Sequence, residues 1–423
     1  MYEIICDVAV IGGGPAGLGA AMSAKEHGAG KVVVVERDDT LGGILQQCIH
    51  PGFGLTYFGE ELTGPEYYSR FLEKDNELGV EYLLDTMVLD LDPAGVLTCV
   101  SGIQGMVRVE AKSIVLAMGC RERTRAQLQI PGTRPAGVYC AGTAQRLINR
   151  QNEMVGRKVV ILGSGDIGMI MARRLTIEGA QVVAVIEIMD YLAGLTRNKV
   201  QCLDDFEIPL YLSHTVTRIV GHNRVEGVFV AEVDGNKVPK KETEVFLECD
   251  TLLLSVGLIP ENEITRTAAI AMDPVTNGPV VNQYQRTSAP NVFACGNVVH
   301  VNDLVDNVSV ESKIAGEYAA KHAIGAMPVQ EGLVVTKTGR NVRYTCPMSI
   351  VLDSDRKDCT VFFRVLFPER NARIVARVGD RTVYSRNAFK VNPGEMERVS
   401  FSTKDFADGE TVTVDIQEGN AND

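Results

Sequence analysis

Three glycines near the N-terminus, Gly12, Gly14 and Gly17, have the spacing Gly-x-Gly-x-x-Gly and follow a run of apolar residues. In such a turn the first glycine permits a tight bend and the second lets the backbone approach a pyrophosphate. The third lets the following helix pack closely on the strand. Glu36 follows the next apolar run, where a carboxylate accepts hydrogen bonds from an adenosine ribose. The unit therefore predicts a dinucleotide site; the alternative is a glycine turn of an unrelated α/β protein.

The same pattern occurs again further along the chain, as Gly163, Gly165, Gly168 and Glu187. A carboxylate at the ribose position favours a 2′-hydroxyl and repels a 2′-phosphate, so the second site is predicted to prefer NAD(H). Arg173 and Arg174 could bind a phosphate, but they lie in the middle of the expected helix and are interpreted as a solvated face.

Alternating elements are expected to position both turns. The predicted strands are Val8 to Ile11, Val32 to Val35, Ser113 to Ala117, Val159 to Leu162, Asp250 to Val256 and Val292 to Ala294. The predicted helices are Pro15 to His27, Pro65 to Glu77, Ile167 to Glu178 and Val308 to Ile324, with Asp306 and Asn307 as caps of the last one. Turn-punctuated alternation predicts β meanders over Glu81 to Lys112 and Thr215 to Leu247, and a small all-β appendage beyond about residue 331.

Composition excludes several classes of protein. The chain has 423 residues, with 42 basic and 54 acidic side chains and a formal charge of −12, so a nucleic-acid role is not expected. No run of apolar residues is long enough to span a membrane, and no basic leader precedes the first apolar stretch. The ten cysteines contain no Cys-x-x-Cys pair, which fits reduced thiols and a cytoplasmic location. The dispersed histidines give no metal pattern, and no metal site is expected.

Further strings resemble the flavoprotein family with two dinucleotide domains that includes thioredoxin reductase and the pyridine nucleotide–disulfide oxidoreductases. They are Leu116-Ala-Met-Gly119, Leu254-Ser-Val-Gly257-Leu-Ile-Pro260 and Ser288-Ala-Pro-Asn-Val-Phe-Ala-Cys-Gly296-Asn297. The resemblance covers about residues 5 to 325. It implies FAD in the first site and a nicotinamide cofactor in the second.

More specific strings resemble one branch of that family. They are Leu41-Gly-Gly-Ile, Gln47-Cys-Ile-His-Pro-Gly-Phe-Gly-Leu55, Gly119-Cys-Arg-Glu-Arg-Thr124, Ile130-Pro-Gly-Thr-Arg-Pro-Ala-Gly137 and His300-Val-Asn-Asp-Leu-Val-Asp306. The branch comprises FAD/NAD subunits associated with glycerol-3-phosphate-dehydrogenase-like flavoproteins and with amino-acid and opine dehydrogenases. It implies an electron-transfer subunit whose partners are another flavoprotein dehydrogenase subunit and a small redox protein, in an oligomer or hetero-complex.

The resemblance also implies a fold and a domain order. The expected fold class is α/β, with two Rossmann-like domains, the NAD domain inserted in the FAD domain, and a small C-terminal all-β domain. The expected boundaries are 1–120 and 249–328 for the two parts of the FAD domain, 121–248 for the NAD domain and 329–423 for the β domain. The predicted cofactor-binding residues are Gly12, Gly14, Pro15, Ala16, Gly17, Glu36, Arg37, Gly42, Gly43, Ala117, Gly119, Gly163, Gly165, Asp166, Ile167, Gly168, Glu187, Gly257, Gly296, Asn297, Asp306, Asn307 and Val308.

Two departures from the family pattern matter. The family usually has Asp at the position of Asn297, whose amide oxygen can accept the same ribityl hydrogen bond without a charge. Neither domain has a redox pair of cysteines, so thiol–disulfide reduction by the usual route is not expected.

Cys48 and His50 are the candidate catalytic residues, because they lie in the loop where disulfide reductases of this class carry their cysteine pair. A single thiol there could form a sulfenate or a charge-transfer complex, and His50 could donate a proton. A packed thiol and a structural histidine are the favoured interpretation.

The sequence thus predicts an FAD-dependent oxidoreductase that exchanges a hydride with NAD(H) as one subunit of a dehydrogenase complex. Two alternatives stay open at this point. One is a free-standing NADH:acceptor oxidase or peroxidase that uses Cys48, and the other is a non-catalytic scaffold with structural nucleotides.

Overall fold

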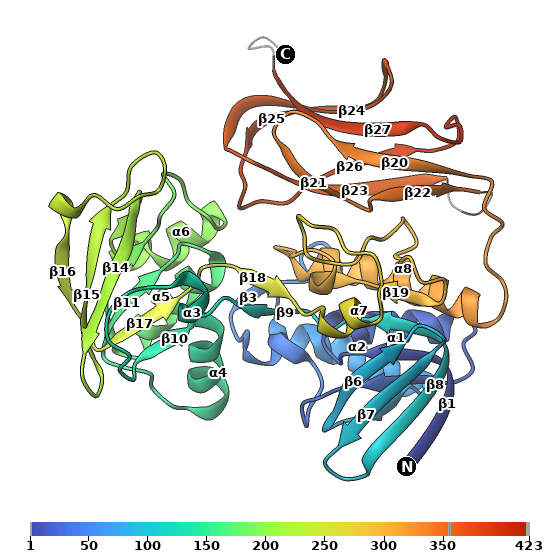
Figure 1. Ribbon diagram of the computed structural model, residues 1–423, viewed down its shortest axis with the longest axis horizontal. Coiled ribbons are helices and arrows are strands. Elements are labelled where there is room, and N and C mark those ends of the chain that lie inside the picture. The colour runs from blue at the N-terminus through green and yellow to red at the C-terminus, as the bar shows by residue number, and fades with distance from the viewer. Residues whose placement is uncertain (1, 354, 356, 420–423) are drawn as a thin grey trace. The chain divides into compact units, whose positions relative to one another are not determined.

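The computed structural model describes residues 2–353, 355 and 357–419 (Figure 1). The chain forms two compact units. The first consists of residues 1–120 and 260–423, and the second is Arg121–Ile259. The finer division into four domains stays a prediction.

A parallel sheet forms the centre of the first unit. Its strands lie in the order β5-β2-β1-β8, and β19 pairs with the far side of β8. Their bounds are Tyr2–Ile11 (β1), Val32–Val35 (β2), Glu81–Leu83 (β5), Gly105–Leu116 (β8) and Val292–Ala294 (β19). The four Val residues of β2 are all buried, as expected for a parallel strand covered on both faces. Because parallel strands end at the same edge, Gly12, Glu36, Ala117 and Cys295 all follow strand ends at that edge.

Strand β8 changes its neighbour along its length within one seven-stranded sheet, which corrects the prediction of a separate strand from Ser113 to Ala117. Its first half pairs with β7 (Val96–Ser101), whose other neighbour is β6 (Thr86–Asp92). Its second half pairs with β19, and β1 pairs along nearly its whole length. Alternation in the first half and continuous burial in the second make one strand look like two in the sequence.

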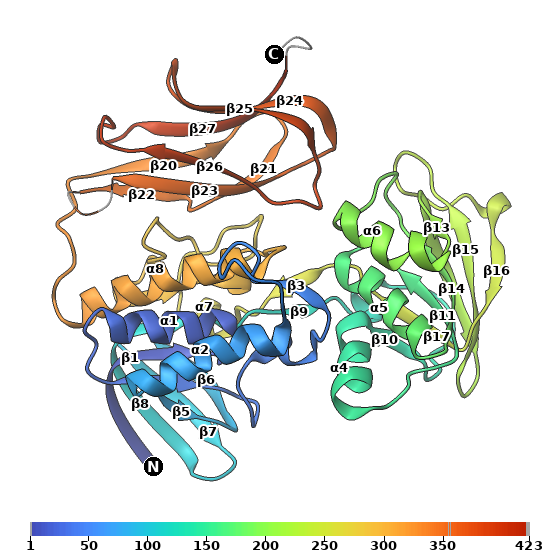
Figure 2. The same cartoon turned by 180° about the vertical axis from the view of Figure 1, so that it is seen from behind.

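Three helices cover one face of this sheet, as Figures 1 and 2 show: α1 (Pro15–Glu26), α2 (Gly64–Leu78) and α8 (Val305–Ala323). Helices α1 and α8 approach each other closely, because a Cβ on Gly19 would lie 2.3 Å from Ser312 Oγ. A Cβ on Gly316 would lie 2.1 Å from the Ala20 carbonyl oxygen. Ser23 Oγ also donates to the Lys313 carbonyl oxygen at 2.7 Å. Small residues on both helices therefore fix where α8 lies relative to the first glycine turn.

The second unit contains a five-stranded parallel sheet in the order β10-β17-β11-β12-β13. Helices α4 (Ala141–Gln151) and α5 (Asp166–Ile177) belong to the same unit. The strand bounds are Val138–Cys140 (β10), Lys158–Leu162 (β11), Gln181–Ile186 (β12), Leu210–Tyr211 (β13) and Thr251–Leu254 (β17). The predicted meander is an antiparallel sheet of β14 (His214–Gly221), β15 (Val225–Glu232) and β16 (Val245–Glu248).

The C-terminal part of the first unit is a pair of β-sheets, β22-β20-β27-β24-β25 and β21-β23-β26, around one apolar core. The bounds are Gly332–Thr338 (β20), Val342–Cys346 (β21), Ser349–Leu352 (β22), Asp358–Val365 (β23), Glu369–Val378 (β24), Arg381–Val391 (β25), Glu397–Ser402 (β26) and Thr411–Glu418 (β27). The predicted fold class, α/β with Rossmann-type domains and a C-terminal β region, is confirmed.

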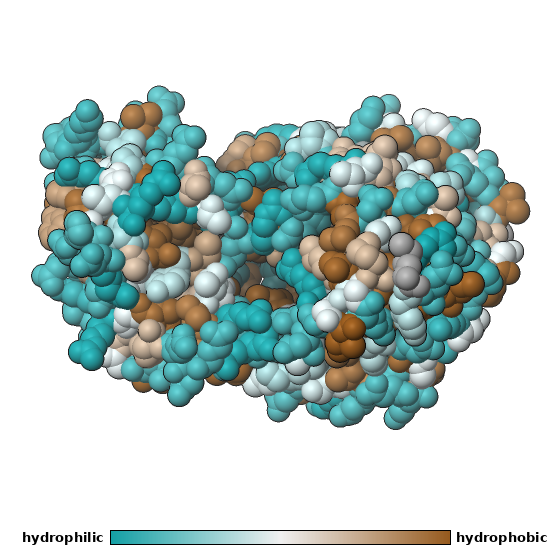
Figure 3. Space-filling view, turned by 60° about the horizontal axis from the view of Figure 1, so that its bottom comes forward, coloured by the Kyte–Doolittle hydropathy of each residue, from teal (hydrophilic) through white to brown (hydrophobic). Residues whose placement is uncertain are grey.

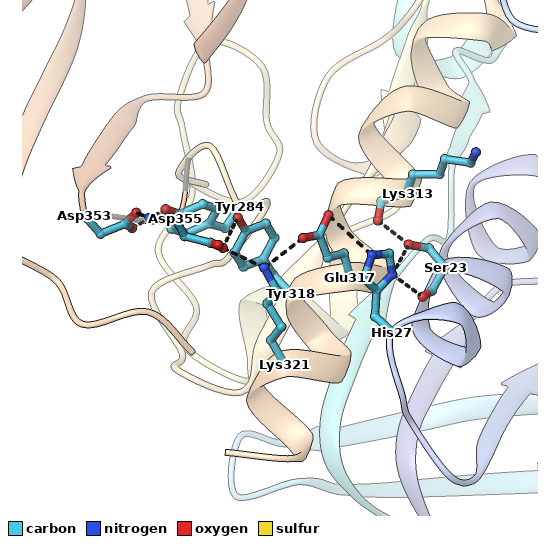
Figure 4. A network of polar contacts seen from close by, with 9 residues as sticks. All are labelled: Ser23, His27, Tyr284, Lys313, Glu317, Tyr318, Lys321, Asp353 and Asp355. Carbon is cyan, nitrogen blue, oxygen red and sulfur yellow. Dashed lines mark hydrogen bonds and ion pairs between the residues drawn. The ribbon is translucent and has the colours of Figure 1, made fainter. Parts of the chain in front are cut away.

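Polar contacts join this β region to α8 and to the loop before β19 (Figure 4). Tyr284 donates to the Asp353 carboxylate, and its ring stacks on Tyr318 with centroids 3.9 Å apart. The Tyr318 hydroxyl and Lys321 both donate to Asp355, at 2.8 and 2.6 Å. Asp353 is therefore held from the loop before β19, and Asp355 is held by the C-terminal half of α8.

The face shown in Figure 3 is mainly hydrophilic, with apolar side chains scattered in small groups. Within the part of the chain that the structure describes, no helix is long and apolar enough to cross a membrane.

We predict that Asp303→Ala lowers the free energy of unfolding by about 3 kcal/mol. The Asp303 carboxylate forms an ion pair with the nearly buried Arg364 of β23 and accepts from the Met396 amide at 2.5 Å, so its loss leaves a buried cation. Chemical denaturation measures the change. The control is Lys74→Ala, which removes an exposed pair with Glu77 and is expected to cost less than about 1 kcal/mol.

Candidate functional site

The first glycine turn connects β1 to α1 and is closed by contacts that only glycine allows. Gly12 has φ of +104°, and a Cβ on it would lie 2.5 Å from the Ala117 carbonyl oxygen. A Cβ on Gly17 would lie 1.8 Å from the Gly12 carbonyl oxygen. These two glycines are therefore required by the packing of the protein itself, independently of any ligand.

Gly14 differs, because its surroundings are open. A Cβ there would meet only Gly43 Cα, at 3.9 Å. Gly14 is the N-cap of α1, no side chain caps the helix, and Pro15 occupies the first turn. The first amides of a helix have no intrahelical partner and attract anions. Open space before such a helix end fits the pyrophosphate of a dinucleotide.

Glu36 lies where β2 ends and is only 8% exposed. One carboxylate oxygen accepts from the Gly13 amide at 2.6 Å and the other from the Asp38 amide at 2.8 Å. A carboxylate oxygen can accept more than one hydrogen bond, so both oxygens can still accept from ribose hydroxyls.

Glu187 makes the same contacts in the second unit. Its carboxylate accepts from the Ser164 amide at 2.8 Å and from the Met189 amide at 2.8 Å, and it is 4% exposed. Ser164 corresponds to Gly13, and Met189 corresponds to Asp38. The two units therefore share the same pair of amide-to-carboxylate hydrogen bonds. The second unit has one more, because the Ser164 hydroxyl donates to Glu187 at 2.7 Å.

The other residues predicted for the second site surround this turn. Gly163 has φ of +101°, and Gly165 is the N-cap of α5 without a side-chain cap. The Gly168 amide donates to Ser255 Oγ at 3.1 Å. Asp166, by contrast, accepts from the Leu195 amide at 2.8 Å and from Asn198 at 2.6 Å, so its carboxylate holds a neighbouring loop.

The start of α8 corrects one prediction. The helix begins at Val305 with Leu304 as N-cap, so Asp306 and Asn307 do not cap it. The buried Asp306 carboxylate instead accepts from the amides of Gly54, Thr56 and Tyr57, at 3.0, 2.7 and 3.1 Å. The three loop amides thus engage the carboxylate in place of the helix end, and the first of them, that of Gly54, belongs to the string from Gln47 to Leu55.

Asn297 lies beside β19 and Gly296. Its amide oxygen accepts from the Asn302 backbone at 2.9 Å, and its amide nitrogen contacts Cys120 Sγ at 3.6 Å. Its contact with FAD stays a prediction, as do the cofactor contacts of Arg37, Ala16, Gly42, Gly119, Gly257, Ile167 and Val308.

Cys48 ends a short 3-10 helix, Gly43–Gln47, and is half-buried. Burial raises the pKa of its thiol to about 12, and Sγ contacts the Ile44 carbonyl oxygen at 3.3 Å. A thiol with so high a pKa is protonated at neutral pH and is a poor nucleophile. His50 contacts the Pro51 carbonyl oxygen at 3.1 Å, and its ring lies 5.0 Å from that of Phe53.

The structure also brings together a buried group that the sequence did not indicate: His300, Glu311 and Cys346. His300 Nε2 lies 2.6 Å from a Glu311 oxygen, and the other Glu311 oxygen accepts from the Gly296 amide at 3.2 Å. Burial alone would lower the pKa of His300, but Cys346 and Glu311 raise it well above its ordinary value. The three residues come from different elements, so no spacing in the sequence could show their proximity.

Comparison with known proteins identifies the family. The model of the pyridine nucleotide-disulphide oxidoreductases matches residues 6–315. The chain belongs to this family. Its enzymes use FAD and NAD(P)H, which agrees with the predicted pair of cofactors.

Individual relatives are distant. The hydrogen cyanide synthase subunit HcnB of Pseudomonas protegens is 26% identical over 68% of this chain and 65% of its own length. The mitochondrial dihydrolipoyl dehydrogenase of Caenorhabditis elegans is 27% identical over 69% of this chain and 63% of its own. The chain thus spans just under two thirds of these two relatives. The crystal structure of T. acidophilum thioredoxin reductase matches 76% of this chain and 99% of its own, with a TM-score of 0.62 and 23% identity, and shows a shared fold.

We predict that Gly14→Ala weakens FAD binding by about tenfold or more without destabilising the ligand-free protein. The methyl group has room in the protein but occupies the space in front of the helix end. Flavin fluorescence titration and thermal unfolding of the flavin-free protein measure the two effects. Gly17→Ala is the contrasting variant, because its methyl group collides with Gly12 and should impair folding itself. Unchanged FAD affinity in Gly14→Ala would contradict the assignment.

Proposed function

We propose that this protein is an FAD-dependent oxidoreductase that exchanges a hydride with NAD(H). The flavin supplies the two-electron chemistry when bound, and the protein binds and orients the two nucleotides. The observation that carries the proposal is the pair of buried carboxylates, Glu36 and Glu187, each of which fixes a glycine turn in the same way.

The choice of NAD(H) over NADP(H) is part of the proposal and rests on Glu187. Its carboxylate is buried at the end of β12, and Ile188 and Met189 follow it, so no cationic side chain comes next in the chain. A 2′-phosphate placed there would meet a negative charge in a medium that screens it weakly. A 2′-hydroxyl would instead donate to the carboxylate.

We predict that NADH bleaches the flavin of the purified protein rapidly under anaerobic conditions and that NADPH does so slowly. Glu187→Gln should lower the ratio of kcat/KM for NADH to that for NADPH by about tenfold, because it removes the repelling charge. The control is Glu36→Gln, the equivalent change in the first unit, which should weaken flavin binding and leave nucleotide preference unchanged. Absence of bleaching by either nucleotide would favour the scaffold interpretation.

We further propose that the protein is the electron-transfer subunit of a glycerol-3-phosphate- or amine/amino-acid-dehydrogenase-like complex. Two strings support this proposal, Gln47 to Leu55 around Cys48 and His300 to Asp306 before α8. One relative, HcnB, is named as a subunit of a synthase. The test is reconstitution with a partner flavoprotein. Reduction of NAD by the partner's substrate should require both chains.

The rival function, an oxidase or peroxidase that depends on Cys48, is disfavoured by the raised pKa of that thiol. We predict that Cys48→Ser retains the NADH-dependent rate of flavin reduction within about twofold, and also turnover with oxygen or peroxide as acceptor. Steady-state kinetics with each acceptor measures this. Loss of turnover with peroxide alone would restore the rival.

A further inference from the structure

Two adjoining cavities lie between α8 and the C-terminal β region. The outer one has a volume of about 480 Å³, and the inner one about 90 Å³. Asn307, Phe362 and Arg398 line both, so the cavities share one wall. The outer cavity alone is as large as a small-molecule site. Asn307, which the sequence assigned to the cofactor, lines both of them.

The inner cavity contains one buried hydrogen-bond acceptor that needs a donor. Gln285 is only 5% exposed, and its side-chain oxygen has no hydrogen-bond partner. Leaving a buried acceptor unpaired costs about 1–3 kcal/mol, so such atoms usually mark a place for a ligand or an ordered water. Glu311 lies in the same wall, and its carboxylate already holds His300 and the Gly296 amide.

The outer cavity carries excess positive charge. The Arg386 guanidinium lies 2.6 Å from a Glu397 carboxylate oxygen, so these two charges compensate each other. The charge of Arg398, which lines the same cavity, is left uncompensated by that pair. Among the residues that the structure describes, the Arg398 side chain has no hydrogen bond or ion pair. Leu304, the N-cap of α8, and Asn307 of its first turn line the same cavity, so the positive end of the helix faces it. The Asp306 carboxylate of that turn is instead bound by three loop amides. An anionic group is therefore favoured here.

From this arrangement we propose that the paired cavities bind a small organic anion that also carries hydroxyl or amino groups. Its carboxylate or phosphate binds Arg398 in the outer cavity, and its donors reach Gln285 in the inner one. Phe362 and Met396 contact the carbon skeleton. The proposal does not depend on the proposed function, because it concerns a site apart from both glycine turns.

Calorimetric titration of the flavin-loaded protein, without nicotinamide nucleotide, tests the proposal. The probes are glycerate, glycerol 3-phosphate and uncharged glycerol, which separate a carboxylate from a phosphate and both from the skeleton alone. At least one anion should bind with a dissociation constant of about 10 mM or lower, and glycerol should bind far more weakly. Failure of both anions to bind, or equal binding of glycerol, would overturn the proposal.

Variants separate the two ends of the site. Arg398→Gln should weaken anion binding about tenfold to a hundredfold, whereas Arg343→Gln, an exposed arginine that lines neither cavity, should leave it unchanged. Gln285→Leu removes an unpaired buried acceptor. It should therefore not lower the melting temperature of the ligand-free protein but should abolish most of the stabilisation that the anion gives. Anion binding that is unaffected by both Arg398→Gln and Gln285→Leu would place the ligand elsewhere and refute the assignment.

Discussion

Both glycine turns depend on hydrogen bonds from their backbone amides to a buried carboxylate. Glu36 and Glu187 are charged groups almost removed from water, and each is compensated by backbone amides on either side. Each contact ties the end of the second strand to the turn after the first. The first helix of each unit begins directly after the turn that the carboxylate holds.

Much of the fold could be predicted because its signals are local. Strands β2 and β19 have the bounds that their short apolar runs predict. Helices α1 and α5 begin within one residue of expectation, because a glycine turn precedes each. The errors concern residues whose partners are distant in sequence. Strand β8 looked like two strands because its neighbours change midway, and Asp306 looked like a cap because its loop partners lie some 250 residues earlier. His300, Glu311 and Cys346 could not be associated for the same reason.

The cysteines illustrate how structure changes the meaning of a residue type. None of the ten is in a disulfide, and burial raises the pKa of the Cys48 thiol to about 12. A pair of thiols next to the flavin is therefore not available to this chain for exchanging electrons. This constraint agrees with the proposed exchange of electrons between NAD(H) and another redox centre.

The paired cavities have one wall on α8 and the other on the β sandwich. Mutations in β25 and β26 can therefore reshape the sandwich wall during evolution while the strands that carry the glycine turns stay untouched. A lineage could exchange one small metabolite for another in this way and keep the same redox core. The β-sandwich would then determine which ligand is bound, while the two glycine turns would keep their role in binding nucleotides.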